Sequence, residues 1–377
     1  MTAAAQALTL PTVTSGSVLP GRTVPGETVY ESLPSAARLL ELFPADEAAL
    51  AGVERAREEI RAILDGLDDR LLVIAGPCSI HDTEAGLDYA QRLAEQARQH
   101  RSELLVVMRC YFEKPRTTVG WKGLINDPGL DGGHDIARGL REARGFLRDV
   151  GRTGLPVATE FLEPLSAPYL EDLVAWGAIG ARTTESQIHR QMAAALPMPV
   201  GFKNATDGSA APAIDACEAA SGPQSFLGTD ADGRVSLVSA PGNRDGHVIL
   251  RGGSSGPNHR AESVVAVSEA LSARGANPRL VIDASHGNSG KNHHRQAEVA
   301  LEIGAQLESG PTSETIAGVM LESFLVGGAQ PFDPSAGRSA RDGLVRGQSI
   351  TDACMDWEVT VQVLEGLAGA VRNRRAR

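Results

Sequence analysis

This sequence of 377 residues has few cysteines, no long apolar segment and no excess of positive charge. Its four cysteines lie far apart, which favours reduced thiols or a metal ligand over a disulfide framework. No run approaches the roughly 18 apolar residues of a membrane span, and the N-terminus lacks the basic start and apolar core of a signal peptide. The net charge of −11 argues against a basic nucleic-acid surface. We therefore expect a cytoplasmic protein that binds neither membrane nor nucleic acid.

What the sequence does contain is a series of eight short apolar runs. Runs of this length, separated by segments long enough for a helix, are typical of parallel strands buried on both faces. Eight of them predict an α/β fold, a closed (β/α)8 TIM barrel. The runs span residues 71–78, 104–109, 156–160, 178–182, 199–203, 247–251, 279–286 and 317–322. The segments between and after them predict helices over residues 84–99, 136–150, 168–176, 186–196, 211–220, 261–274, 294–308 and 352–372.

The chain is longer than the roughly 250 residues of a bare barrel, so we expect extensions to a single domain. Residues 1–35 are small, polar and punctuated by proline and glycine, and they are expected to be flexible. Apolar residues recur at helical spacing within residues 36–68, which predicts a helical extension. Its apolar face must be buried either under the barrel floor or against another subunit, and we favour another subunit. Residues 69–377 then form the catalytic barrel, with a small β-hairpin inserted within residues 225–246.

Each apolar run ends, within a few residues, in a charged or metal-capable side chain. Because side chains fill a barrel interior, polar groups gather where the strands end, and active sites are built there. The eight residues are Cys78, Arg109, Glu160, Arg182, Lys203, Arg251, His286 and Glu322. One thiolate, one imidazole and two carboxylates can hold a divalent transition metal without the closed thiolate cage of a structural zinc. The candidate ligands are Cys78, His286, Glu322 and Asp352.

Positive side chains are concentrated at the same strand ends, against the acidic background of the chain. Such a concentration indicates anionic substrates. Lys203 could form a Schiff base, but the neighbouring cations favour a phosphate-binding role for it. The cations are Arg109, Lys114, Arg116, Arg182, Lys203 and Arg251. The loop that begins at Arg109 also carries Tyr111, Phe112 and Trp121, which indicates that it packs down onto the barrel.

Eight motifs carry these residues: GPCSIHD, RCYFEKPRTTVGWKGLINDP, GAIGARTTESQ, PVGFKNATDG, HVILRGG, IDASHGNSGK, GVMLES and SITDAC. In this order they resemble the motifs of type I 3-deoxy-D-arabino-heptulosonate 7-phosphate (DAHP) synthases of the microbial, aromatic-regulated subfamily. The likeness runs from about residue 37 to the C-terminus. It implies condensation of phosphoenolpyruvate with D-erythrose 4-phosphate and water to give DAHP and phosphate, the first step of the shikimate pathway and of aromatic amino acid biosynthesis.

The resemblance also implies roles for particular residues. A divalent ion (Mn²⁺, Fe²⁺, Co²⁺ or Zn²⁺) would be held by the four candidate ligands. Phosphoenolpyruvate would be bound by Arg109, Lys114, Arg182, Lys203 and Arg251, with the backbone amide near Ala181. The aldose phosphate would contact Lys114, Pro115, Arg116 and Thr117. Catalytic roles would fall to Lys114, Cys78, Glu160 and His286, with Glu160 orienting or deprotonating the attacking water.

Family members are commonly homodimers or homotetramers, and aromatic amino acids are their effectors. Here Ala167 and Pro197 replace a commonly seen proline and serine near the effector region, which weakens the prediction of feedback inhibition. Three other functions were weighed: a paralogue that condenses phosphoenolpyruvate with another aldose phosphate, a Schiff-base aldolase that uses Lys203, and a non-catalytic regulatory subunit. The last would lack ligands, and none is missing from the sequence.

Overall fold

The computed structural model describes residues 28–116 and 120–377, and the chain divides into two units, Met1–Leu33 and Pro34–Arg377. The first 27 residues of the segment predicted to be flexible, 1–35, therefore lie outside the described residues. So does Thr117, one of the predicted substrate contacts. The account below concerns the second unit.

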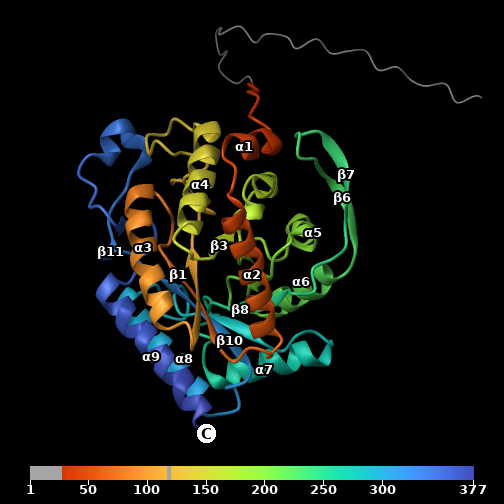
Figure 1. Cartoon of the computed structure of the whole chain (residues 1–377), viewed down its shortest axis with the longest axis vertical. Coiled ribbons are helices and arrows are strands. Elements are labelled where there is room, and N and C mark those ends of the chain that lie inside the picture. Colours follow the sequence, from red (N-terminus) through yellow and green to blue (C-terminus); the bar gives the residue numbers. More distant parts are fainter. Residues whose placement is uncertain (1–27, 117–119) are drawn as a thin grey trace, which may run out of the picture. The chain divides into compact units, whose positions relative to one another are not determined.

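Within the described residues, eight parallel strands close into a barrel in the order β1-β10-β9-β8-β5-β4-β3-β2 (Figure 1). Every predicted run contributes one of these strands, so the predicted (β/α)8 barrel is confirmed. All residues of the eight strands are buried, because helices cover the outer face and side chains fill the interior. The strands are β1 (Leu71–Gly76), β2 (Leu104–Arg109), β3 (Val157–Glu160), β4 (Trp176–Ile179), β5 (Val200–Lys203), β8 (His247–Leu250), β9 (Leu280–Asp283) and β10 (Ile316–Glu322).

The register of the strands brings their carboxyl ends to one mouth of the barrel. Gly76, which ends β1, pairs with Glu322, which ends β10. Asp283, which ends β9, pairs with Met320 of β10. Side chains at these positions, and in the turns that follow, therefore meet even though they are far apart in the sequence.

The helices between the strands follow the predicted segments with one main exception. Residues 168–176 were predicted to be a helix, but the chain forms two short 3₁₀ turns, η1 (Pro164–Tyr169) and η2 (Glu171–Leu173), and Trp176 begins β4. Val174 is already extended and Trp176 begins β4, so the few residues that follow Pro168 are too short a segment for an α-helix. The α-helices of the barrel are α3 (Thr83–Gln99), α4 (Ile136–Gly151), α5 (Gln187–Ala195), α6 (Ala211–Ser221), α7 (Ala261–Ala273), α8 (His293–Glu308) and α9 (Trp357–Arg375).

Two helices precede the barrel, α1 (Ala36–Leu42) and α2 (Glu47–Leu64). The apolar face of α2 belongs to the same buried cluster as the side chains that fill the barrel interior, including Leu72 and Ile74 of β1. The carbonyl of Leu64 accepts a hydrogen bond from Asn277, which lies just before β9. Helix α2 therefore closes the amino-terminal floor of the barrel. Our expectation that this face would be buried against another subunit was wrong, because the open floor of a barrel offers apolar side chains within the same chain.

A β-hairpin, β6 (Gln224–Thr229) and β7 (Val235–Ala240), is inserted before β8, as predicted. After β10 the chain forms a second small sheet from β11 (Val326–Ala329) and β12 (Gln348–Ser349), with the 3₁₀ segment η3 (Pro334–Arg341) between them. The chain that follows β12 places Asp352 at the carboxyl-terminal mouth. Among the described helices, none combines the length and the apolar character needed to cross a bilayer.

Candidate active site

A cavity of about 430 Å³ lies at the carboxyl-terminal mouth of the barrel. Eleven of the predicted site residues line it: Arg109, Lys114, Pro115, Arg116, Glu160, Ala181, Arg182, Lys203, Arg251, His286 and Asp352. Ten of them come from the ends of β2, β3, β4, β5, β8 and β9 and from the loops that follow, and Asp352 follows β12. The fold therefore places these predicted side chains together at one mouth of the barrel.

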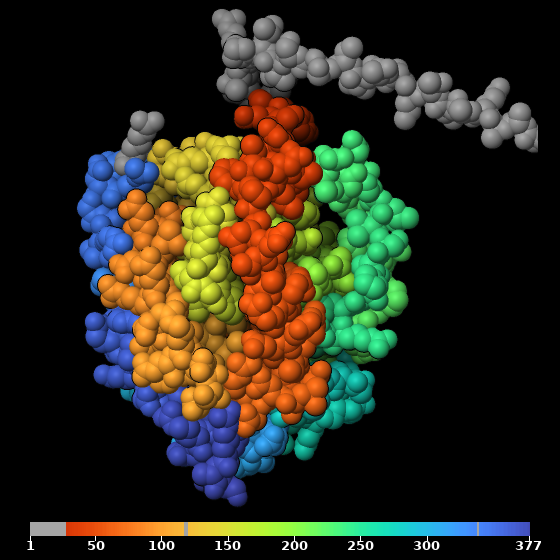
Figure 2. Space-filling model, in the orientation of Figure 1, coloured from red at the N-terminus to blue at the C-terminus, as the bar shows by residue number. Residues whose placement is uncertain are grey.

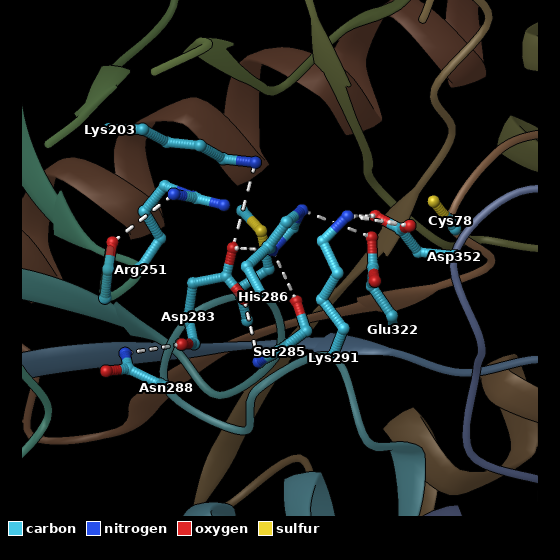
Figure 3. Close-up of polar contacts among 12 residues, drawn as sticks. Cys78, Lys203, Arg251, Asp283, Ser285, His286, Asn288, Lys291, Glu322 and Asp352 are labelled. Carbon is cyan, nitrogen blue, oxygen red and sulfur yellow. Dashed lines mark hydrogen bonds and ion pairs between the residues drawn. The ribbon is translucent and has the colours of Figure 1, made fainter. Parts of the chain in front are cut away.

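Three of the four predicted metal ligands form a compact group. One donor atom each from Cys78, Glu322 and Asp352 lies within 4.8 Å of the other two. Figure 3 shows these side chains converging from separate segments of the chain. His286 is outside this group of three, but its Nε2 lies 3.7 Å from Oε1 of Glu322. The fourth predicted ligand is thus adjacent to the group.

Cationic side chains face these donor atoms. Lys114 Nζ lies 3.1 Å from Cys78 Sγ, and Lys291 Nζ lies 3.1 Å from an oxygen of Asp352. Arg109 Nη2 lies 3.0 Å from Glu322 Oε1, yet this buried oxygen accepts no hydrogen bond from the described residues. A buried carboxylate oxygen without a donor, beside a thiol, an imidazole and a second carboxylate, fits a divalent transition metal ion.

The Cys78 thiol sits in an environment that favours its protonated form when no ion is bound. Burial raises its pKa and the charge of Glu322 raises it further, while Lys114 and Arg109 oppose the shift. A divalent cation would invert this balance, because a coordinated thiol loses its proton.

Asp283 was not among the predicted site residues, although it ends β9 and is fully buried beside the site. Its Oδ2 lies 2.9 Å from His286 Nδ1. Burial alone would raise the pKa of this carboxyl, but His286 and Lys203 together hold it far below its usual range. Asp283 therefore stays ionised, and its ion pair with Nδ1, together with the Ser285 hydroxyl 2.7 Å from the same atom, positions the imidazole with Nε2 toward Glu322. The sequence signal was an acidic residue at the end of an apolar run, three positions before a candidate ligand.

We expect Asp283→Asn to lower the affinity for a divalent ion by about 10- to 100-fold, because the partner that orients a ligating histidine contributes that much. Competition against a fluorescent chelator would measure the change. Asp232→Asn, in the exposed turn of the hairpin, is the matched control. Equal affinity in Asp283→Asn and the wild type would contradict the role of Asp283.

Tyr111 organises the cations beneath the cavity, and it too was missed as a site residue. Its buried ring lies 3.7 Å from Arg109 Cζ and 5.4 Å from Lys203 Nζ, and Lys114 Nζ is 5.9 Å away. A ring face attracts cations electrostatically, so Tyr111 helps three like charges to lie close together. The neighbouring aromatic residues of this loop are buried, as predicted.

Lys203 lies between two buried carboxylates, with Nζ 3.2 Å from Glu160 Oε2 and 3.7 Å from Asp283 Oδ2. Burial would raise the pKa of Glu160, but the charges of Lys203, Lys114 and Arg109 outweigh it and lower that pKa. Glu160 is therefore an ionised carboxylate at the cavity wall, able to accept a proton. The nearby guanidinium of Arg251 bonds the carbonyl of Gly252 at 3.3 Å.

The loop that carries Lys114 and Arg116 is anchored by a buried carboxyl. Glu113 accepts a hydrogen bond of 2.9 Å from the Ser166 hydroxyl of η1. Burial raises the pKa of Glu113 to about 7, although the bond from Ser166 opposes the shift. Between the ordinary pKa of a glutamic acid and about 7, the folded chain holds a proton that the unfolded chain has released.

This linkage predicts a pH-dependent stability. The contribution of Glu113 is fully present below the ordinary pKa of a glutamic acid and is lost as the pH rises through about 7. Because Glu113→Gln carries no proton to lose, its melting temperature should rise relative to wild type between about pH 5 and about pH 8. Thermal unfolding at several pH values tests this, with Glu58→Gln, a change at an exposed position of α2, as the control. A difference that stays constant over this range would count against it.

The fold and the site define a class of protein: a (β/α)8-barrel enzyme whose mouth gathers cations for anionic substrates beside a set of metal-capable donors. Residues 45–365 match the DAHP synthetase I family. The chain therefore belongs to the DAHP synthetase I family, and the resemblance seen in the motifs is confirmed.

Individual relatives agree with this assignment. The chain is 56% identical over 348 residues to a phospho-2-dehydro-3-deoxyheptonate aldolase of Corynebacterium glutamicum, with 92% of this chain and 94% of the relative covered. It is 50% identical to the Phe-sensitive enzyme of Escherichia coli, with 92% and 96% covered. The structure of the Francisella tularensis aldolase of the same name has a TM-score of 0.88 at 45% identity and covers 94% of this chain and 100% of its own.

Proposed function

We propose that this chain condenses phosphoenolpyruvate with D-erythrose 4-phosphate and water to give DAHP and phosphate, the first step of aromatic amino acid biosynthesis. The observation that carries the proposal is a cavity lined by seven lysine and arginine side chains, beside the grouped donors Cys78, Glu322 and Asp352, in a member of this family. The two substrates carry three acidic groups between them, one carboxylate and two phosphates, and the cations offset their mutual repulsion.

We propose that a divalent metal ion is held by Cys78, His286, Glu322 and Asp352. The proximity of the donors supports this, and so does the buried Glu322 oxygen that accepts no hydrogen bond from the described residues. When bound, the ion supplies Lewis acidity toward the aldehyde of the sugar phosphate. Mn²⁺, Fe²⁺, Co²⁺ and Zn²⁺ all accept this mixture of sulfur, nitrogen and oxygen ligands.

The proposed substrate contacts divide the cavity into two parts. Phosphoenolpyruvate is bound by Arg109, Lys114, Arg182, Lys203 and Arg251 with the Ala181 amide, and the aldose phosphate by Lys114, Pro115, Arg116 and Thr117. Lys114 is proposed to contact both substrates. Its ammonium group lies over the Tyr111 ring and beside Cys78, between the two proposed sets of contacts. Holding both substrates in fixed positions lowers the entropic cost of bringing the reacting carbons together.

The reaction joins the methylene carbon of phosphoenolpyruvate to the aldehyde carbon of the sugar. Lys114 is the proposed proton donor to the aldehyde oxygen, and the Cys78 thiol, 3.1 Å from Lys114 Nζ, is the alternative donor. Positive charge that develops on the enol-ether carbon is then quenched by water. The ionised Glu160 orients this water and takes its proton, and phosphate leaves by cleavage of its carbon–oxygen bond.

A phosphate-release assay tests the proposed function. Phosphate should appear from phosphoenolpyruvate with erythrose 4-phosphate, and release should stop with a chelator and resume when metal is restored. Faster release with arabinose 5-phosphate would favour the paralogue instead. Trapping of a substrate adduct by borohydride would favour the Schiff-base aldolase, but Lys203 is ion-paired with Glu160 rather than held in an apolar pocket.

We further propose that an aromatic amino acid inhibits this enzyme. Relatives bear the names tyrosine-inhibited, in Schizosaccharomyces pombe, and Trp-sensitive, in Salmonella typhimurium. Adding phenylalanine, tyrosine and tryptophan separately to the same assay would identify the effector. Equal rates with all three would contradict the proposal.

We also propose that the chain forms a homodimer or homotetramer. The hairpin exposes three large apolar side chains on one face, Leu227, Val235 and Leu237, with Leu227 paired directly opposite Leu237. Exposed apolar patches of this kind are common at subunit contacts. Leu227→Ser combined with Leu237→Ser should lower the mass measured by sedimentation, and an unchanged mass would contradict the use of this face.

Two assignments complete the proposal. We propose that residues 36–68 form a helical extension and residues 69–377 the catalytic barrel. We place the enzyme in the cytoplasm, because the four cysteines are free thiols and Cys78 can bind a metal only while it is reduced.

A further inference from the structure

A second cavity, of about 640 Å³, lies at the opposite end of the barrel from the catalytic mouth. It is bounded by α2, by the last turns of α3 and α4, and by the first residues of β2 and β3. Figure 2 shows these three helices adjoining on the face turned to the viewer, with α2 in orange-red, α3 in orange and α4 in yellow. Nothing in the proposed reaction uses this cavity.

The cavity exists because small residues face one another across it. Helix α2 contributes Ala48, Ala49 and Gly52, α3 contributes Ala94 and Ala97, and the end of α4 contributes Gly151. A side-chain carbon added at Gly52 would have Arg55 Nη2, 3.7 Å away, as its nearest neighbour, and one added at Gly151 would have Ala49 Cβ, at 3.9 Å. Both positions therefore border open space rather than packed atoms.

The floor of the cavity is apolar. Its lining includes the start of β2 and side chains from α2, α4 and the segments around β3. These residues are Val53, Leu104, Leu105, Val106, Leu147, Leu155, Val157 and Leu173. Floors of this kind bind the apolar body of a small organic ligand, and the volume lies in the usual range for such sites.

The rim of the cavity is basic, in a chain whose net charge is −11. Five arginines line it against two acids, Asp46 and Glu59. Arg70, Arg98 and Arg152 have carboxylate partners. Within the described part of the chain, neither Arg55 nor Arg101 makes an ion pair. The Nη2 atom of Arg55 lies over Gly52, on the helix face that borders the cavity.

We propose that this cavity binds a small organic carboxylate with an aromatic or branched apolar body. The carboxylate pairs with the arginines at the rim, and the apolar body lies on the floor between α2 and the ends of α3 and α4. Inorganic phosphate would leave that floor in contact with water, whereas a neutral apolar ligand would forgo the charge-assisted bonds to the arginines. Only an anion with an apolar body satisfies both the basic rim and the apolar floor.

Binding at this place would hold α2 against the barrel. Because α2 closes the amino-terminal floor, a ligand that contacts α2 and two barrel helices together adds stability only to the folded chain. The ligand should therefore raise the melting temperature in proportion to its occupancy, without entering the catalytic mouth.

The test uses three compounds of matched shape: hydrocinnamate, hydrocinnamyl alcohol and hydrocinnamyl amine in its ammonium form. Calorimetric titration of the full chain, saturated with phosphoenolpyruvate to occupy the catalytic cations, gives their affinities. The carboxylate should bind about tenfold more tightly than the alcohol, and the ammonium compound should bind most weakly. Arg55→Gln with Arg101→Gln should remove the preference for the carboxylate, and Ala97→Trp should fill the cavity and abolish binding of all three.

The control for lost charge is Arg92→Gln with Arg141→Gln, two exposed arginines of α3 and α4 that do not line the cavity. This variant should bind hydrocinnamate as the wild type does, and phosphate release should be unchanged in all of these variants. Equal binding of the carboxylate and the alcohol, or unaltered binding in Ala97→Trp, would overturn the proposal. Binding seen only after removal of residues 1–27, or only in a dissociated monomer, would also overturn it, because the cavity would then belong to the chain's own N-terminus or to a second copy.

Discussion

Cys78→Ala is expected to abolish turnover and to lower the affinity for a divalent ion by more than about 100-fold, since even outer-shell partners of a metal contribute 10- to 100-fold. Cys78 supplies the only sulfur in the group of three donors that the described residues bring within 4.8 Å. Without it, two carboxylates and His286 remain, a set of ligands that holds a soft transition metal less well. Elemental analysis of the purified protein, together with phosphate release at saturating metal, measures both effects.

Cys217→Ala is the matched control, because Cys217 is also a buried free thiol but lies in α6, on the wall of the barrel. It should lose some stability and keep its metal. Full metal content in Cys78→Ala would remove this residue from the ligand set. Full metal content with no turnover would instead indicate that Cys78 acts as a proton donor. The thiol lies 3.1 Å from Lys114 Nζ, so it is close enough to the proposed donor to take that role.

Lys203→Ala is expected to lower kcat/KM by about 1,000-fold, in line with the loss of one group that stabilises charge in the transition state. The ammonium group faces the cavity and offsets two buried carboxylates, Glu160 and Asp283. Its removal leaves their charges uncompensated, so the melting temperature should also fall. The chain should still fold, because Arg109 and Lys114 remain nearby. Steady-state kinetics and circular dichroism separate the two effects.

Arg182→Ala should lose turnover to a similar degree, and Lys122→Ala is the control for both variants because this exposed lysine belongs to the same loop as Lys114. Near-normal kcat/KM in both Lys203→Ala and Arg182→Ala would remove the cationic clamp from the mechanism. A loss confined to KM for phosphoenolpyruvate would assign these residues to ground-state binding alone.

Much of the site could be predicted because the strands of a parallel barrel end at one mouth. Once eight apolar runs were identified, residues that follow them, such as Arg251, had to lie near one another whatever their spacing in the chain. Asp283 and Tyr111 were missed because their roles depend on contacts with His286 and with three cations, and no periodicity records such contacts.

Other errors came from competition between local and tertiary preferences. Residues 168–176 carry apolar spacing that suits a helix, but Val174 is extended and Trp176 begins β4, which leaves too few residues for one. The apolar face of α2 was recognised correctly, while its partner was not. Periodicity shows that a helix must bury one face, but it carries no information about which surface will cover that face.

The sequence by itself determined the barrel, the family and the chemical types gathered at the mouth, because strand periodicity and ordered motifs are properties of the chain. Only the tertiary structure decided that α2 seals the barrel floor, that Asp283 orients His286, and that small residues of three helices enclose a second cavity with a basic rim. The reason is physical: distances, burial and cavities arise from packing among segments remote in sequence, and each depends on where all the others lie.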